Sequence, residues 1–228
     1  MLIKGIVFDL DHTLYDRYAT IEAGAEFFCR RFADRLSSAI TPAVAAKLLC
    51  DGDRLYIYYG WRRIFTYLCE SGMFSDVPEY EEYRDCMLEL YSTYAEPFPF
   101  TYTVLDDIKG RTLALGLITN GNSKVQRAKL SLLGIERYFD EIIVCGELGI
   151  SKPEAAPFDE MARRLGIPSK ELLYVGDNPI NDVTASRNAG YIPVEVLTAE
   201  CVLEDATPAE HRIRTVAELP ALIDKFNN

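Results

Sequence analysis

Five short runs of apolar residues, rich in the types that favour β-strands, recur along the chain, and each one ends at polar or glycine residues. Continuous apolar runs of this length are typical of strands that are buried on both faces of a sheet. Such strands occur mainly in parallel sheets whose two faces are covered by helices. The runs occupy residues 3–10, 113–119, 141–145, 172–176 and 191–196.

Segments with helical periodicity lie between these runs, and most of them stop at a glycine, the residue that most often ends a helix. They span residues 123–133, 157–165 and 179–189, and they are followed by Gly134, Gly166 and Gly190. Alternating strands and helices predict a parallel sheet with right-handed crossovers. We therefore expect an α/β fold with a doubly wound, Rossmann-like parallel sheet.

Residues 17–97 break this alternation. They contain no apolar run that resembles a buried strand, but they show helical patterns at residues 21–36 and 80–94. The sequence therefore predicts a catalytic core made of residues 1–16 and 98–228, with an inserted all-helical module at residues 17–97.

The composition excludes several classes of protein. With 228 residues, 49% of them hydrophobic, the chain can bury a sizeable core. Its net charge of -11 opposes binding to nucleic-acid polymers and to anionic membranes. No apolar run approaches the length of a membrane span, and the first residues lack the features of a signal peptide. We predict a cytoplasmic protein whose six cysteines are reduced thiols.

Polar side chains with catalytic potential follow the predicted strands. Open parallel sheets bind ligands beyond the carboxyl ends of their strands, so these side chains should meet in one crevice. They are Asp9 and Asp11 after the first run, Thr119, Asn120 and Gly121 after the second, Lys152 in the loop after the third, and Asp177 and Asp182 after the fourth.

Carboxylates that share a small crevice repel one another unless a cation offsets their charge. Oxygen ligands favour a hard cation, and magnesium commonly binds one or two carboxylates together with a substrate phosphate. We therefore expect a Mg²⁺ site that also binds phosphate. Lys152, the Thr119 hydroxyl and the loop at Asn120 and Gly121 are the candidates that would contact the phosphate oxygens.

Asp9 and Asp11 are suited to two different roles. A carboxylate can attack phosphorus and form an aspartyl-phosphate, but the leaving alkoxide then needs a proton, and the water that follows needs a base. Side chains two residues apart on an extended backbone point to the same side, so Asp11 can stand beside Asp9. The pair predicts a nucleophile and an acid/base group.

Four segments resemble, in order along the chain, the motifs of the haloacid dehalogenase-like (HAD) hydrolase superfamily. They are Asp9-Leu10-Asp11-His12-Thr13-Leu14, Leu117-Ile118-Thr119-Asn120-Gly121, Lys152-Pro153 and Gly176-Asp177-Asn178-Pro179-Ile180-Asn181-Asp182. The resemblance covers residues 2–16 and 101–196, and the inserted module is similar to the helical cap of this family.

The resemblance implies a role for each aspartate. Asp9 would be the nucleophile and a magnesium ligand, and Asp11 would be the acid/base group and bind the metal through its backbone carbonyl. Asp177 would be a further ligand, and Asp182 would support the metal site from the second layer or through water. Because the dehalogenases of the family lack the second aspartate, Asp11 disfavours dehalogenation.

The inserted module carries a cluster of aromatic and basic residues. It consists of Tyr56, Tyr58, Tyr59, Trp61, Arg62, Arg63, Phe65 and Tyr67. Aromatic residues at helical spacing usually pack a helical bundle, so we favour packing over substrate contact, with Arg62 or Arg63 best suited to a contact. Near the C-terminus, we expect a closing helix at residues 217–226.

The sequence therefore predicts a magnesium-dependent phosphatase that acts through an aspartyl-phosphate on Asp9, as a monomer or homodimer. A cap that closes over the site favours a small phosphorylated metabolite, such as a nucleoside monophosphate or a sugar phosphate. Two alternatives stay open. One is a phosphoglucomutase-like phosphotransferase, and the other is a non-catalytic binding protein on the same fold.

Overall fold

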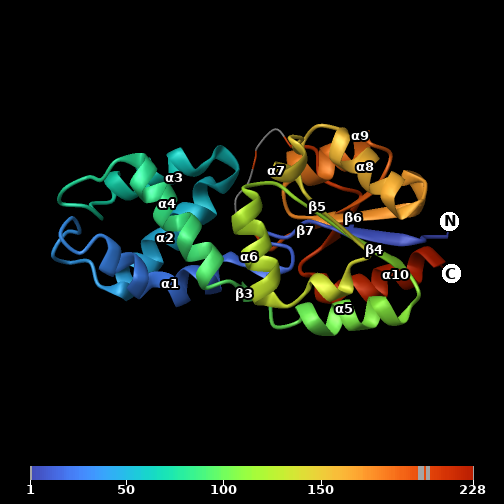
Figure 1. Cartoon of the computed structure of the whole chain (residues 1–228), viewed down its shortest axis with the longest axis horizontal. Helices are drawn as coiled ribbons and strands as arrows, with labels where there is room; N and C mark the ends of the chain where they lie inside the picture. Colours follow the sequence, from blue (N-terminus) through green and yellow to red (C-terminus); the bar gives the residue numbers. More distant parts are fainter. Residues whose placement is uncertain (1, 200–202, 204–205, 228) are drawn as a thin grey trace. The chain divides into compact units, whose positions relative to one another are not determined.

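The computed structural model describes residues 2–199, 203 and 206–227, which divide into two compact units (Figure 1). The core unit comprises residues 2–16, Pro97–Ala199 and residues 206–227, and the cap unit comprises Arg17–Glu96. The family term "cap" is used here only as a label for the second unit.

A six-stranded sheet forms the centre of the core unit. Its strands are β1 (Gly5–Phe8), β4 (Ala114–Thr119), β5 (Glu141–Val144), β6 (Leu172–Gly176), β7 (Ile192–Val196) and β8 (His211–Ile213). The strand order is β5-β4-β1-β6-β7-β8, and all neighbouring strands are parallel. Every residue of β1 and β6 is buried, as their apolar sequences predict for strands in the middle of the sheet.

Helices cover both faces of this sheet. They are α5 (Thr101–Gly110), α6 (Ser123–Leu133), α7 (Cys145–Leu148), α8 (Ala156–Leu165), α9 (Ala185–Asn188) and α10 (Leu219–Asn227), with 3₁₀ turns at Glu136–Tyr138, Ser169–Glu171 and Val216–Glu218. Figure 1 shows α5 and α10 on one side of the sheet and α8 and α9 on the other. The predicted doubly wound α/β fold is confirmed.

The segment after β6 differs from the helix predicted at residues 179–189. A π-helical turn over Pro179–Thr184 precedes the short α9. The Asn178 side chain caps this turn, because its oxygen accepts from the backbone N–H groups of Ile180 at 3.0 Å and Asn181 at 2.9 Å. Such wide turns are frequent at functional sites, and this one carries Asp182.

The cap unit is helical. Its helices are α1 (Arg17–Arg31), α2 (Pro42–Tyr56), α3 (Trp61–Glu70) and α4 (Tyr80–Thr93), with a 3₁₀ turn at Ile57–Tyr59. The helix predicted at residues 21–36 thus ends five residues early. Two short strands, β2 (Tyr15–Asp16) and β3 (Glu96–Pro97), pair with each other at the points where the chain passes between the two units.

Aromatic side chains of the cap unit pack against one another. The ring centroids of Phe65 and Tyr83 lie 5.0 Å apart, and those of Tyr56 and Tyr67 lie 5.7 Å apart. The Arg63 guanidinium stacks over the Tyr56 ring at 4.2 Å. For these rings the packing interpretation is supported, while a contact between this cluster and substrate stays a prediction.

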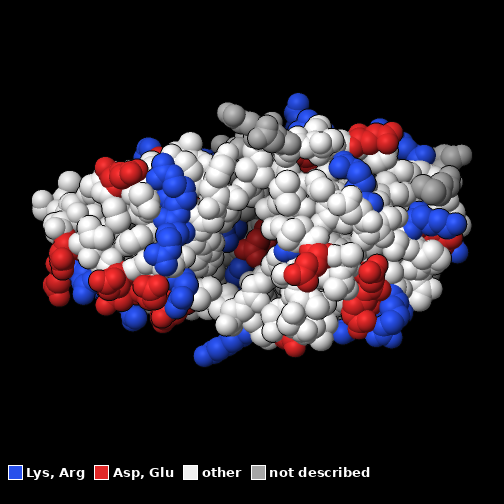
Figure 2. Space-filling view, turned by 90° about the horizontal axis from the view of Figure 1, so that it is seen from above, with Lys and Arg blue, Asp and Glu red and all other residues white. Residues whose placement is uncertain are grey.

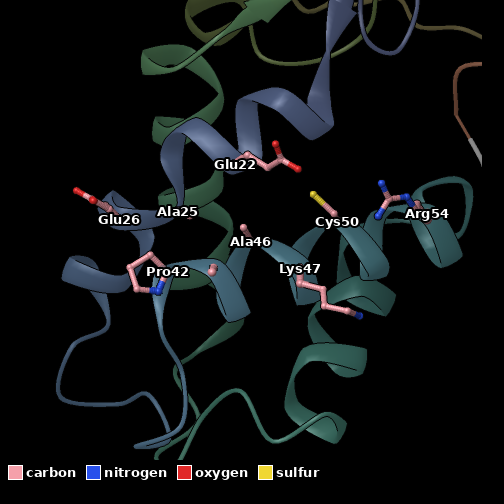
Figure 3. Close-up of a pocket in the computed structure, with 9 residues that line it drawn as sticks. Glu22, Ala25, Glu26, Pro42, Ala46, Lys47, Cys50 and Arg54 are labelled. Carbon is pink, nitrogen blue, oxygen red and sulfur yellow. The ribbon is translucent and has the colours of Figure 1, made fainter.

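An open pocket of about 490 Å³ lies between α1 and α2 of the cap unit (Figure 3). Ala25, Ala46 and Cys50 are its buried lining residues, and Lys47 and Arg54 bring positive charge to it. Both cations pair with Asp51 of the same helix, at 2.5 and 3.5 Å. Because these charges are already satisfied locally, we assign no function to the pocket.

The charged surface, the helix lengths and the cysteines each bear on an expectation from the composition. Acidic and basic side chains are interspersed on the face shown in Figure 2. Within the described part of the chain, no helix combines the length and the apolar character needed to cross a membrane. The five described cysteines are free thiols, and Cys201 lies outside the described residues.

Candidate active site

Asp9 follows β1 directly, at the carboxyl edge of the sheet. Its backbone N–H donates to the Val175 carbonyl at 2.9 Å, which extends the pairing of β1 with β6 by one residue. The residue is 7% exposed. Burial raises the pKa of Asp9 to about 7; Lys152 counteracts this rise, and the charges of Asp182 and Asp11 add to it. A negative charge at Asp9 therefore depends on nearby cations.

The Lys152 ammonium connects two carboxylates of the predicted site, the predicted nucleophile Asp9 and the metal-site candidate Asp182. Its Nζ lies 2.6 Å from Asp9 Oδ1, 2.6 Å from Asp182 Oδ1 and 2.9 Å from the Tyr174 hydroxyl. The side chain is 3% exposed. Burial acts to lower the pKa of Lys152, but the Asp182 and Asp9 carboxylates outweigh it and raise the pKa well above its usual value. Lys152 is thus a buried, charged lysine.

Asn120 fixes the backbone of Lys152. The Asn120 side-chain oxygen accepts the Lys152 N–H at 2.9 Å, and its amide group donates to the Lys152 carbonyl at 2.8 Å. The sequence predicts Asn120 as a phosphate-binding residue. In the structure its side chain is occupied by this double contact, so a phosphate contact by Asn120 would have to use its backbone.

Three carboxylates lie close enough to share a cation. One oxygen each from Asp9, Asp177 and Asp182 falls within 4.8 Å of the others, and all three residues are buried. The second oxygen of Asp182 accepts from the Asn178 N–H at 2.9 Å. Gly176 allows this approach, since a Cβ at that position would lie 2.5 Å from the Asp182 carboxyl group. The donor set is all oxygen, which fits a hard cation.

The loop after β1 carries Asp11 and reverses tightly. Backbone N–H groups of Leu14 and Tyr15 both donate to the Leu10 carbonyl, at 3.0 and 3.1 Å. His12 has a φ of 55°, in the left-handed region, and its carbonyl accepts from the Thr198 hydroxyl. His12 is 2% exposed.

Two residues of α6 that the sequence did not single out bind Asp11. Lys129 Nζ lies 2.8 Å from Asp11 Oδ1, and Gln126 Nε2 lies 3.0 Å from Asp11 Oδ2. The same Gln126 nitrogen donates to the Thr119 hydroxyl. Both α6 residues are 3% exposed. Their three-residue spacing on a predicted helix was the only available signal, because it places them on one face.

Thr119 and Gly121 lie at the end of β4. Thr119 is 1% exposed, and its hydroxyl donates weakly to the Asn120 carbonyl at 3.3 Å. Gly121 has a φ of 116°, which only glycine adopts readily. A Cβ on Gly146 would lie 2.5 Å from the Gly121 carbonyl oxygen, so the two segments pack closely. The loop therefore requires glycine at position 121 for its backbone conformation and at position 146 for the close approach.

The predicted site residues come together in two connected sets. Asp9, Asp182 and Asn120 all contact Lys152, and Asp177 completes the acidic group. In the second set, Gln126 links Thr119 to Asp11. All of these residues belong to the core unit. The side chains predicted to meet at the strand ends therefore do contact one another. The chemical role of each residue stays a prediction.

Comparison with known proteins identifies the family. The model of haloacid dehalogenase-like hydrolases matches residues 6–196. The chain belongs to this family. The chain is 27% identical to the glyceraldehyde 3-phosphate phosphatase of Methanocaldococcus jannaschii, over 100% of this chain and 98% of that protein. It is 30% identical to the phosphoglycolate phosphatase of Neisseria gonorrhoeae, over 85% and 80% of the two chains.

A solved HAD-hydrolase structure has the same fold. The putative HAD-hydrolase YfnB of Bacillus subtilis, determined with bound magnesium, is similar with a TM-score of 0.72 and 20% identity, covering 98% of this chain and 100% of that one. The family match begins in β1 and ends with β7, so it includes all four motif segments and the inserted cap unit. The strand β8 and α10 lie outside it.

Proposed function

We propose that this HAD-like hydrolase is a magnesium-dependent phosphatase, which hydrolyses a small phosphate monoester through an aspartyl-phosphate on Asp9. The observation that carries the proposal is the buried contact of Lys152 with both Asp9 and Asp182, at 2.6 Å each. An anionic nucleophile approaches an anionic phosphate only where fixed cations offset the repulsion. Lys152 is such a cation, at the carboxyl end of a parallel sheet.

The acidic group is suited to magnesium. One oxygen each of Asp9, Asp177 and Asp182 lies within 4.8 Å of the others, and hard cations such as Mg²⁺ are bound by carboxylate oxygens. We assign Asp9, Asp177 and the Asp11 carbonyl as ligands. Asp182 already accepts from Lys152 and from a backbone N–H, so its role is support. Bound Mg²⁺ would offset charge on the phosphate and on the carboxylates.

The phosphate would lie between Lys152 and the end of β4. Lys152 Nζ, the Thr119 hydroxyl and the backbone N–H of Gly121 are donors of the kind that stabilise charge on the oxygens around phosphorus. The Thr119 hydroxyl is suited to this contact, because its donation to the Asn120 backbone carbonyl is long, at 3.3 Å.

The reaction would run in two steps. An Asp9 carboxylate oxygen attacks phosphorus while the bond from phosphorus to the ester oxygen breaks, and the Asp11 carboxyl gives its proton to that leaving oxygen. A water molecule then attacks the phosphorus of the aspartyl-phosphate, the Asp11 carboxylate takes a proton from it, and Asp9 leaves as a carboxylate. The sum is ester plus water to alcohol plus phosphate.

The relatives support a small substrate. Their names assign them glyceraldehyde 3-phosphate and phosphoglycolate, which are esters with two or three carbon atoms. The net charge of -11 disfavours a polyanionic substrate. We propose a small phosphorylated metabolite of this kind, and place nucleoside monophosphates and larger sugar phosphates beside it in the first substrate panel.

Phosphate release tests the proposal. The parent chain and Asp9→Asn would be assayed with 4-nitrophenyl phosphate, 2-phosphoglycolate and glyceraldehyde 3-phosphate, in Mg²⁺ and in chelator. Asp159→Asn is the matched control, because Asp159 is exposed on α8. We expect release that requires Mg²⁺ and falls at least about 10³-fold in Asp9→Asn only.

Other outcomes are equally clear. Release that survives in Asp9→Asn would remove the aspartyl-phosphate from the mechanism. Isomerisation of a sugar phosphate that outpaces phosphate release would indicate the phosphotransferase. No turnover of any ester by folded, magnesium-loaded protein would favour a binding protein on this fold.

A further inference from the structure

Two buried side chains of α6 have no role in the function proposed above. Gln126 and Lys129 are each 3% exposed, three residues apart on one face of the helix. A lysine and a glutamine are rarely buried without a partner that offsets the loss of water. Both reach the same carboxylate, Asp11. Lys129 also stacks over the Tyr15 ring at 4.7 Å, which fixes the direction of its side chain.

The contacts with Asp11 determine how the Gln126 amide is turned. Its NH₂ group faces Asp11, and the reverse orientation would direct the amide oxygen at the carboxylate that the first step leaves on Asp11. The same nitrogen donates its second hydrogen to Thr119 Oγ1. Since Thr119 accepts from Gln126, the Thr119 hydroxyl hydrogen must point elsewhere, and it is directed at the Asn120 carbonyl at 3.3 Å. A phosphate oxygen would be a better acceptor at the same position.

We propose that Gln126 and Lys129 are positioning residues, which hold the Asp11 carboxyl group and the Thr119 hydroxyl in one fixed arrangement for catalysis. The proposal rests on the proposed function, in which Asp11 moves the proton and Thr119 binds the phosphate. Lys129 and Gln126 together engage both carboxylate oxygens of Asp11, at 2.8 and 3.0 Å, and so limit its rotation. Gln126 also makes the Thr119 hydroxyl a donor toward substrate.

In this arrangement the first step leaves a carboxylate on Asp11 that is already bound by two donors. Its proton has gone to the leaving oxygen, as the bond from phosphorus to that oxygen breaks. The Lys129 ammonium then faces an anion rather than a neutral acid, which stabilises the products of this step. The arrangement should therefore matter most for esters whose leaving oxygen requires the proton.

Leaving-group dependence provides the test. A phenolate such as 4-nitrophenolate leaves with little help, whereas the alkoxide of 2-phosphoglycolate or glyceraldehyde 3-phosphate needs the proton. Because kcat/KM covers the steps through the first irreversible one, it reports transfer to Asp9 and not the later hydrolysis. The measurement is the ratio of kcat/KM for the alkyl ester to kcat/KM for the aryl ester, taken on one preparation, so that any unfolded fraction cancels.

We expect Lys129→Met to lower kcat/KM for the alkyl ester by about 10²-fold and for the aryl ester by less than about 5-fold, since a displaced general acid loses most of its effect. Gln126→Leu should lower both, through Thr119, and also lower the ratio. Lys129→Arg keeps a cationic donor and should restore part of the ratio. Lys124→Met is the control, because Lys124 is exposed on the same helix, and its ratio should equal that of the parent.

A double-mutant cycle shows whether Lys129 acts through Asp11. In the Asp11→Asn background the ratio is already low, and adding Lys129→Met should leave it unchanged. An unchanged ratio in both Lys129→Met and Gln126→Leu, while Asp11→Asn lowers it, would overturn the positioning role and leave the proposed function intact. A parent that hydrolyses neither ester would overturn the proposed function and this inference with it.

Discussion

Replacing Lys152 by methionine removes the charge that Asp9 and Asp182 share. In the parent, the Lys152 ammonium lies 2.6 Å from an oxygen of each carboxylate, and all three residues are at least 93% buried. Methionine keeps most of the side-chain volume, so the change is mainly one of charge. The buried carboxylates of Asp9 and Asp182 would then lie close to each other and to Asp177 without a neighbouring ammonium group.

The expected cost follows from two limits. Breaking a buried ion pair by removing one partner typically costs about 3–5 kcal/mol. The second limit is protonation: Asp9, whose pKa is about 7 in the parent, is already partly protonated at pH 7, and further proton uptake in the variant moderates this cost. We therefore expect Lys152→Met to lower the free energy of unfolding by about 3–4 kcal/mol at pH 7 without divalent cations.

The loss should depend on pH in a defined direction. Burial raises the pKa of Asp9 already in the parent, and removal of Lys152 takes away the group that lowers it. A carboxyl whose pKa is raised by folding stabilises the fold most below its unfolded value of about 4, and this contribution is lost as the pH rises through the folded value. The difference between variant and parent should therefore shrink between pH 7 and pH 5.

Urea denaturation followed by far-UV circular dichroism measures this effect. Lys109→Met is the matched control: Lys109 pairs with Asp140 at 2.7 Å, but 42% of its side chain is exposed, so its loss should cost less than about 1 kcal/mol. Addition of Mg²⁺ should recover part of the deficit of Lys152→Met. A variant as stable as the Lys109 control, at pH 7 and without divalent cations, would refute the idea that Lys152 offsets buried carboxylates.

Three further predictions concern other parts of the chain. His12 has a φ of 55°, so His12→Val should lower the unfolding free energy by about 1–2 kcal/mol more than His12→Gly does, as measured by thermal denaturation. In the cap unit, Arg17 and Asp53 form a buried pair at 2.6 Å, and Arg17→Met should destabilise the cap by about 3–5 kcal/mol, read from the fluorescence of Trp61, the single tryptophan. Burial raises the pKa of Cys50 from 9.0 to about 12, so this thiol should resist alkylation by iodoacetamide at pH 8. The cap unit should also lose stability as the pH rises above about 9. Rapid alkylation of Cys50, measured by mass spectrometry, would contradict its burial.

The sheet was predictable because its central strands are apolar throughout. β1 and β6 are buried at every residue, and a continuous apolar run is a signal that a single sequence carries. The strand β8 has only three residues, His211–Ile213, of which one is buried, and it lies at the edge of the sheet. Its sequence has no feature that separates it from a loop, and only pairing with β7 defines it.

The candidate site was predictable to the extent that it depends on strand ends. Asp9 directly follows β1 and Thr119 is the last residue of β4, so their positions at one edge of the sheet could be inferred. Gln126 and Lys129 could not be found in this way. A polar residue on a helix usually faces water, and only the packing of α6 reveals that these two are buried against Asp11.

A count of charges connects the two buried lysines with the proposed metal. When Asp11 is a carboxylate, the two connected sets of the site contain four charged aspartates, Asp9, Asp11, Asp177 and Asp182, and the ammonium groups of Lys152 and Lys129 offset two of their charges. Two negative charges remain, which one divalent cation would neutralise. Burial is the main cause that raises the pKa of Asp9 to about 7, and the neighbouring charges of Asp182 and Asp11 add to it. A nucleophile must be ionised, so the proposed cation would serve to ionise Asp9 as well as to bind phosphate.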